Sequence, residues 1–164
     1  MEIKLTLALP RDELSVPVVR RVLKQAMGTL GVERECIGDV ELALTEACSN
    51  VLNHAVDAEE YEVSAGIDGS TCVIEVVDRG AGFDSTTLGH SDAEHSAEGG
   101  RGIQIMRALV DRVEFQSSQP AGTVVRLEKH LQWREESVIR ALSEGKDPTK
   151  HGPWSQDDGA PQTA

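Results

Sequence analysis

The chain has 164 residues, a formal net charge of −12 at pH 7 and a sequence pI near 4.8. This length suits one domain with a single core, and because only 3% of the residues are aromatic, the core should be aliphatic. The acidic balance argues against direct nucleic-acid binding, and the lack of an apolar leader or a long apolar run argues against export and membrane spanning, so we expect a cytoplasmic protein.

Apolar alternation and turn residues predict the first elements. Residues 3–9 alternate between apolar and other side chains, which predicts a strand that Pro10 ends. Ser15 offers an N-cap for a first helix, and Gly31 separates that helix from a second one, which begins near Glu35. The three cysteines have no metal-ligand spacing, so reduced and buried thiols are expected at Cys36, Cys48 and Cys72.

The rest of the chain predicts four more strands and one helix. The strands are residues 61–67, 71–77, 113–117 and 123–131, and the helix is residues 103–110. The first two strands are joined at Asp68-Gly69, which is a hairpin signal. From Trp133 the composition changes, so we predict one domain at residues 1–131 and an extension at 132–164 that is partly helical and then disordered.

The predicted helix at residues 41–55 carries a distinctive set of polar residues. Leu42, Glu46, Asn50 and Asn53 follow one another at spacings of four, four and three, so they lie along one stripe of the helix. Apolar residues surround that stripe, which places its polar groups at the edge of a packed layer, where they need partners. The ordinary alternative is an amphipathic helix whose Glu46 and Asn50 are solvated.

Two glycine-containing segments could bring the backbone close to a ligand. Asp78-Arg-Gly-Ala-Gly82 follows a β-branched strand, and Gly99-Gly-Arg-Gly102 opens a helix whose unpaired N–H groups suit a phosphate. The first segment alone is more typical of a plain turn. The loop between them contains His90 and His95, but no known metal-ligand spacing is present there.

The chemistry that these residues offer is that of a nucleotide site. The chain has no GxxxxGK[ST] motif, which excludes a P-loop. Asn50 supplies an oxygen of the kind that Mg²⁺ prefers, and Glu46, one turn away, could accept a proton from an attacking hydroxyl.

Four motifs in order carry a family resemblance. They are Glu46-Ala-Cys-Ser-Asn50 with Asn53-His54-Ala55, Asp78-Arg-Gly-Ala-Gly82, Gly99-Gly-Arg-Gly102, and Gly122-Thr123. Together they resemble the four boxes of the GHKL ATPases, and the short chain with residues 107–111 and 126–130 is most similar to the bacterial anti-sigma factor serine kinases. The resemblance covers about residues 1–131 and implies an α+β fold, a two-layer α/β sandwich of the GHKL (Bergerat) type whose mixed sheet is covered on one face by helices.

The resemblance also implies roles for residues that match the motifs. Glu46 would be the general base, Asn50 would hold Mg²⁺, and Asp78 would bind the adenine amino group with help from Gly82 and Thr123. Gly100 and Gly102 would face the phosphates of ATP. The implied nucleotide-binding set is Asn50, Asn53, Asp78, Gly80, Gly82, Gly100, Arg101, Gly102 and Thr123.

The implied function is that of an anti-sigma factor. A homodimer with bound ATP and Mg²⁺ would inhibit a sigma factor and phosphorylate a serine or threonine of an anti-anti-sigma partner, and Arg20 would lie where the first helix meets partners. One alternative is an ATP-binding module that sequesters a partner without phosphoryl transfer. A detached histidine-kinase domain is the weaker alternative, because no phospho-acceptor histidine precedes Glu41. Gln104 departs from the residue that many relatives carry, and the C-terminal tail is outside the pattern.

Overall fold

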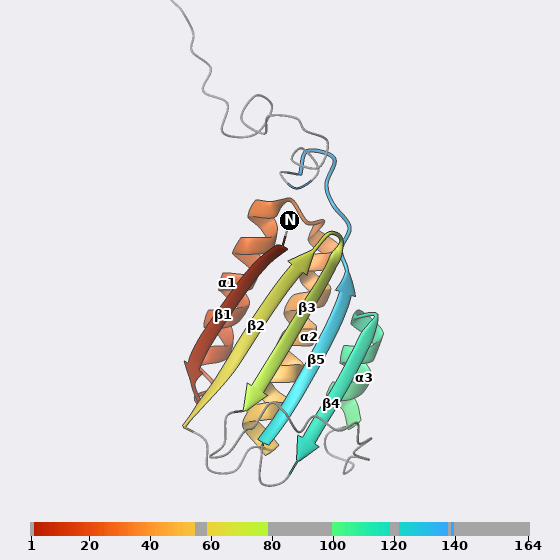
Figure 1. Cartoon of the computed structure of the whole chain (residues 1–164). Coiled ribbons are helices and arrows are strands. Elements are labelled where there is room, and N and C mark those ends of the chain that lie inside the picture. The colour runs from red at the N-terminus through yellow and green to blue at the C-terminus, as the bar shows by residue number, and fades with distance from the viewer. Residues whose placement is uncertain (1, 55–58, 79–99, 119–121, 138, 140–164) are drawn as a thin grey trace, which may run out of the picture.

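The computed structural model describes residues 2–54, 59–78, 100–118, 122–137 and 139. These residues form five strands and three helices, namely β1 (Glu2–Pro10), α1 (Ser15–Leu30), α2 (Arg34–His54), β2 (Glu60–Asp68), β3 (Thr71–Asp78), α3 (Gly100–Leu109), β4 (Arg112–Ser118) and β5 (Gly122–His130). The three helices cover one face of a single sheet, which confirms the predicted two-layer α+β sandwich (Figure 1). Within the described part of the chain, no helix has the length and apolar character that a membrane crossing requires.

The sheet corrects one detail of the prediction. Its strand order is β1-β2-β3-β5-β4, and every neighbouring pair among these five strands is antiparallel, so the sheet is not mixed. The crossover through α3 does make β3 and β4 run in the same direction. However, β5 lies between them and runs the opposite way, so the two parallel strands never become hydrogen-bonded neighbours.

The β2–β3 hairpin shows how local sequence sets the register. Asp68 pairs with Thr71 across a two-residue loop, and Gly69 has a φ of 58°, which glycine adopts without strain. Residues along both strands then alternate between the core and the open face. The hairpin that the sequence predicted is therefore confirmed, and the same register places Tyr61 opposite Asp78 at the other end of the two strands.

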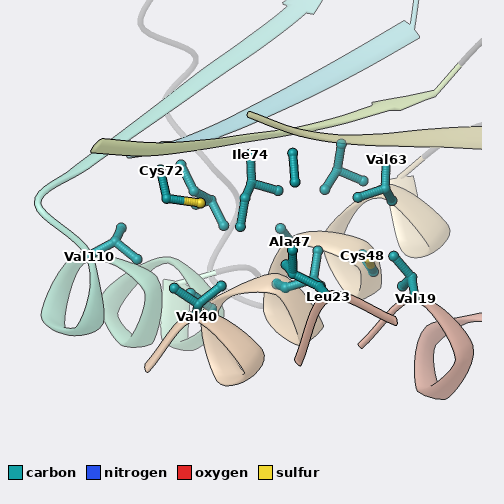
Figure 2. Close-up of a cluster of buried hydrophobic side chains, with 14 of the residues drawn as sticks. Val19, Leu23, Val40, Ala47, Cys48, Val63, Cys72, Ile74 and Val110 are labelled. Atoms are coloured by element: carbon teal, nitrogen blue, oxygen red, sulfur yellow. The ribbon is translucent and has the colours of Figure 1, made fainter. Parts of the chain in front are cut away.

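The core lies between the sheet and the helices. Val63 and Ile74 point from the sheet toward Leu23 of α1 and Ala47 of α2, as Figure 2 shows. Ala47 and its neighbours on one face of α2 are completely buried, so this helix is held firmly at the centre of the helical layer. The cysteines are Cys36, Cys48 and Cys72, and all three are free and buried, as predicted.

The start of α1 differs from the prediction. Leu14 occupies the N-cap position without a side-chain hydrogen bond, and Ser15 is the first residue of the helix. Ser15 is buried, its hydroxyl donates to the backbone carbonyl of Asp12, and it shares a 2.6 Å hydrogen bond with the hydroxyl of Tyr61. The expected cap is wrong because the Ser15 hydroxyl instead contributes to a tertiary contact between α1 and β2.

Residues that follow β5 cover the end of the sheet that carries the β2–β3 hairpin. The amide of Glu33 donates to the carbonyl of Gln132, and the amide of Arg134 donates to the carbonyl of Gly31. Trp133 forms a bridge with Val32 between these two bonds. The first residues after position 131 thus join the turn between α1 and α2, while most of the predicted extension lies outside the described residues.

Candidate functional site

The polar stripe of α2 lies where the sequence predicted it, at the edge of a packed layer. Glu46 and Asn50 are half-buried, Asn53 is exposed, and Leu42 at the other end of the stripe is 46% exposed. The opposite face of the helix is completely buried at Ala43, Leu44, Ala47, Cys48 and Val51. Because that face is fixed in the core, the stripe is presented by a rigid element.

The first turn of α3 packs against Glu46. A Cβ atom placed on Gly102 would lie 2.9 Å from Oε2 of Glu46, which is closer than real Cβ contacts allow. A side chain at position 102 would therefore require the Glu46 carboxylate, the flexible end of its side chain, to shift from this position. The contact brings Glu46 beside the N-terminus of a ten-residue helix, whose first backbone N–H groups lack intrahelical partners.

Asp78, the last residue of β3, is a buried carboxylic acid with an unmet hydrogen-bond requirement. The residue is 1% exposed, and its Oδ1 has no hydrogen-bond partner among the described residues. Burial raises the pKa of Asp78 above its ordinary value of 3.8, and the positive charge of Arg11 opposes that rise. A buried acceptor of this kind calls for a donor, which a ligand can supply.

Thr123 lies at the same end of the sheet as Asp78. Val77 pairs with Val124, so Thr123, which is one residue earlier in β5 and half-buried, is the residue of β5 beside Asp78. Figure 1 shows that α2 and β3 end here and that α3 and β5 begin here. Four elements that are distant in sequence thus bring their predicted site residues to one end of the molecule.

The donors and acceptors at this end fit a magnesium nucleotide. The Asp78 oxygen that no described residue satisfies can accept a hydrogen bond from an amino group, and the start of α3 can hold a phosphate. The amide oxygen of Asn50 suits Mg²⁺. Gly100 and Arg101 open α3, and Arg101 is exposed.

Part of the predicted site lies outside the described residues. This applies to Gly80 and Gly82, and to the loop with His90 and His95. Among the described residues, no group of three or more His, Cys, Asp or Glu side chains could hold a metal ion.

A separate groove lies between β1 and α1. It has a volume of about 710 Å³ and is lined by Ile3, Val18, Arg21, Val22, Gln25, Ala26, Thr29 and Leu30. None of the predicted site residues that the structure describes lines it. Its walls are mainly apolar and contain no carboxylate, so it does not match the chemistry of the predicted site.

Arg11 is a residue that the sequence analysis missed. Its guanidinium Nη2 donates a 2.7 Å hydrogen bond to the carbonyl of Leu52, in the last turn of α2. A single arginine after Pro10 gives no motif, so only the fold reveals that it reaches the end of the helix that carries Asn50 and Asn53.

Comparison with known families agrees with this geometry. The model of the histidine kinase-like ATPase domain matches residues 9–129, which include α2, β3, α3 and most of β5. The chain belongs to the histidine kinase-like ATPase domain family.

Members of this family with curated names include serine-protein kinases. The serine-protein kinase RsbW of Bacillus velezensis is 31% identical over 134 residues, covering 75% of this chain and 82% of the relative. RsbW of Bacillus pumilus is 31% identical over 141 residues, covering 75% and 83%. The predicted family is confirmed, and the names of these relatives together with the ATPase domain support the predicted enzyme class, an ATP-dependent serine/threonine kinase.

A solved structure has the same fold. A crystal structure of the RsbU and RsbW domains of a Mycobacterium tuberculosis protein matches with a TM-score of 0.61 and 20% identity. The match covers 79% of this chain and 32% of that longer chain. At this identity the similarity establishes the histidine kinase-like fold alone.

Proposed function

We propose that the protein is an anti-sigma factor that binds and inhibits a sigma factor and uses Mg-ATP to phosphorylate a serine or threonine of an anti-anti-sigma partner. The observation that carries the proposal is the buried oxygen of Asp78, which no described residue satisfies, at the end of the sheet where Glu46 meets the start of α3. Membership of a family with named serine-protein kinases supports the same chemistry.

The nucleotide would lie across the ends of α2, β3 and α3. Asp78 would accept a hydrogen bond from the adenine amino group, with Gly80, Gly82 and Thr123 around the base. Asn50 would hold Mg²⁺ through its amide oxygen. The remaining predicted contacts to the nucleotide are Asn53, Gly100, Arg101 and Gly102. Their placement at the start of α3 and the end of α2 supports this assignment.

Glu46 would act as the general base. It would accept the proton of the partner's hydroxyl as that oxygen attacks the terminal phosphorus of ATP, and ADP would leave. Bound ATP supplies the phosphoryl group, and Mg²⁺ supplies charge compensation. Glu46 is half-buried against Gly102, so its carboxylate is held beside the helix N-terminus that would face the phosphates.

The protein partners would be a sigma factor, an anti-anti-sigma factor and a second copy of this chain in a cytoplasmic homodimer. Arg20 and Arg21 are exposed on α1, in a chain whose net charge is −12. This local basic face would suit an acidic protein surface, and the overall charge makes direct nucleic-acid binding unfavourable.

A phosphoryl-transfer experiment tests the proposal. Labelled ATP and Mg²⁺ are added to a lysate of the source cell with wild type, Glu46→Ala or the control Glu41→Ala. Glu41 lies on the same helix but forms an ion pair with Lys24, away from Gly102. We expect an acid-stable label on a small protein with wild type and Glu41→Ala, and a loss of about 10²-fold or more with Glu46→Ala.

Nucleotide binding is measured on the same three proteins. We expect Glu46→Ala to bind Mg-ATP as wild type does, because the base acts on the partner's hydroxyl. Equal labelling by wild type and Glu46→Ala would reject the assigned base. Binding of Mg-ATP without any labelling would favour the alternative, an ATP-binding module that sequesters a partner without transfer.

A further inference from the structure

Arg11 lies at the end of the sheet where Asp78 ends β3. The register runs from Leu9 in β1 to Tyr61 in β2 and from Tyr61 to Asp78, so these three residues form one row across the strands. Arg11 follows this row by two residues, and its backbone amide donates a 2.9 Å hydrogen bond to the carbonyl of Glu59. That bond continues the β1–β2 pairing beyond the last strand residue and fixes the backbone of Arg11.

The side chains of Arg11 and Asp78 both turn toward the helical layer. Leu9 and Asp78 are buried, and Arg11 is two residues beyond Leu9, which is the spacing of one face of an extended chain. The half-buried guanidinium then reaches the carbonyl of Leu52 at 2.7 Å. A cation at the C-terminal end of a helix is favourable, so α2 itself holds the guanidinium in place.

The charge of Arg11 acts on Asp78. Burial favours the protonated form of the Asp78 carboxyl group, and the Arg11 charge favours the ionised form, so the two effects oppose each other in the pKa of Asp78. An ionised carboxylate accepts a stronger hydrogen bond than a neutral acid does. Arg11, which lies outside every sequence motif of the site, therefore favours the charged form of the carboxylate that would accept a hydrogen bond from an amino group.

We propose that Arg11 is a positioning residue for base recognition, which keeps Asp78 as a charged acceptor and so makes the site selective for a purine that carries a 6-amino group. This inference rests on the proposed nucleotide site. A carbonyl oxygen in place of the amino group would face the carboxylate with like partial charge, and the pair would lose its hydrogen bond.

The test compares Mg-ATP with the Mg complex of purine riboside triphosphate, which lacks the 6-amino group. Dissociation constants are measured by calorimetry for wild type, Arg11→Met and Arg11→Lys. We expect Arg11→Met to weaken ATP binding roughly tenfold, because the Asp78 hydrogen bond loses its charge assistance. The analogue, which makes no such bond, should bind with an unchanged constant, and Arg11→Lys should restore most of the ATP preference.

Arg134→Met is the matched control. Arg134 also donates from its guanidinium to a helix carbonyl, that of Gly28 at 2.6 Å, but at the end of the sheet where Leu131 bonds Ser70 of the β2–β3 hairpin. We expect it to leave both dissociation constants unchanged. In an Asp78→Asn background, Arg11→Met should have no further effect on ATP, because the group through which it acts is gone.

Three outcomes would overturn the inference. Equal weakening of ATP and the analogue by Arg11→Met would show that Arg11 only fixes the end of α2. An unchanged preference for ATP in Arg11→Met would show that Asp78 needs no help from it. If wild type binds ATP but prefers the analogue, base recognition by Asp78 fails; if wild type binds neither nucleotide, the proposed function itself fails.

Discussion

The two ends of the sheet are built differently. At the end that carries the β2–β3 hairpin, the chain closes its own hydrogen bonds, since the amide of Leu131 donates to the carbonyl of Ser70 and the indole of Trp133 donates to the Ser70 hydroxyl. At the other end, Asp78 is buried with an oxygen that no described residue satisfies. Figure 1 shows both ends, joined by the long central helix α2.

This difference indicates that the hairpin end of the sheet stabilises the fold and that the Asp78 end can bind a ligand. An end whose polar groups are already paired has nothing left to offer a ligand, and it contributes to the free energy of unfolding. An end that leaves a buried acceptor unpaired is less stable by itself and gains stability when a donor arrives. The buried face of α2 continues from Val40 to Val51, so one firmly packed helix connects the closed end of the sheet with the end that carries the site.

The largest effect should come from Gly102→Ala. The new Cβ would lie 2.9 Å from Oε2 of Glu46, so the carboxylate or the start of α3 must move. A displacement of about 1 Å at a catalytic group can reduce transfer on the order of 10²-fold, and we expect that loss in the labelled-ATP assay. Near-wild-type transfer by Gly102→Ala would show that Glu46 can move without cost and that the close contact is not part of the site.

Gly38→Ala is the control for that change. Gly38 is also a helical glycine, it lies near the start of α2, and a Cβ placed on it would meet nothing within 4 Å. Transfer should be unchanged, and the free energy of unfolding should rise by about 0.5–1 kcal/mol, because alanine favours a helix. The pair therefore compares the same chemical change at Gly102 of α3, beside Glu46, and at Gly38 near the start of α2, away from the site.

A smaller effect is expected for Asp78→Asn in the protein without nucleotide. The folded pKa of Asp78 is raised by burial, so the protein binds this proton more tightly when folded than when unfolded. The stabilisation that comes from this tighter proton binding is complete below the ordinary Asp78 pKa of 3.8, and it is lost as the pH rises through the folded pKa of Asp78. The amide that replaces the carboxyl group does not ionise, so the variant should lack this loss.

Chemical denaturation as a function of pH measures the difference. At neutral pH we expect Asp78→Asn to be more stable than wild type by on the order of 1 kcal/mol, with the advantage fading as pH falls below the folded pKa of Asp78. The same variant should bind Mg-ATP more weakly. A variant that is less stable than wild type at neutral pH would mean that the Asp78 charge is well compensated in the folded protein.

The supporting parts of the fold were largely predictable from the sequence. Regular alternation of apolar and polar residues predicts the strands. Asp68-Gly69 predicts the hairpin, because glycine adopts the positive φ of that turn without strain. The stripe of α2 was also predictable, because the spacing of Glu46, Asn50 and Asn53 depends only on helix geometry. The sheet's antiparallel order was not, because the insertion of β5 between β3 and β4 depends on long-range packing.

The candidate site was predictable only where a motif marks it. Asp78 could be identified by the glycines that follow it, but nothing local indicates that it would be buried with an oxygen that no described residue satisfies. Arg11 and Ser15 take their roles from contacts with Leu52 and Tyr61, about 40 or more residues away along the chain. Such contacts depend on the assembled fold, so a single sequence gives no signal for them.

The smallest effect is expected for the reactivity of the thiols of Cys48 and Cys72, which lie in the core between the two ends of the sheet. Burial raises the pKa of Cys48 and of Cys72 to about 12, and a hydrogen bond with Tyr61 only partly opposes this at Cys48. At pH 8 only about one thiol in 10⁴ would then be ionised, and the thiolate is the reactive form. We therefore expect almost no reaction of these two thiols with a disulfide reagent in the native protein.

Unfolding provides the control, because all three cysteines are free and should react completely in denaturant. In the native protein, slow labelling of Cys48 and Cys72 should occur through opening of the core, so Mg-ATP should slow both by the same factor. Rapid native labelling would show that the central layer is open. If Mg-ATP protected Cys48 on α2 but not Cys72 on β3, the site end and the supporting end would open as separate units, and α2 would not couple them.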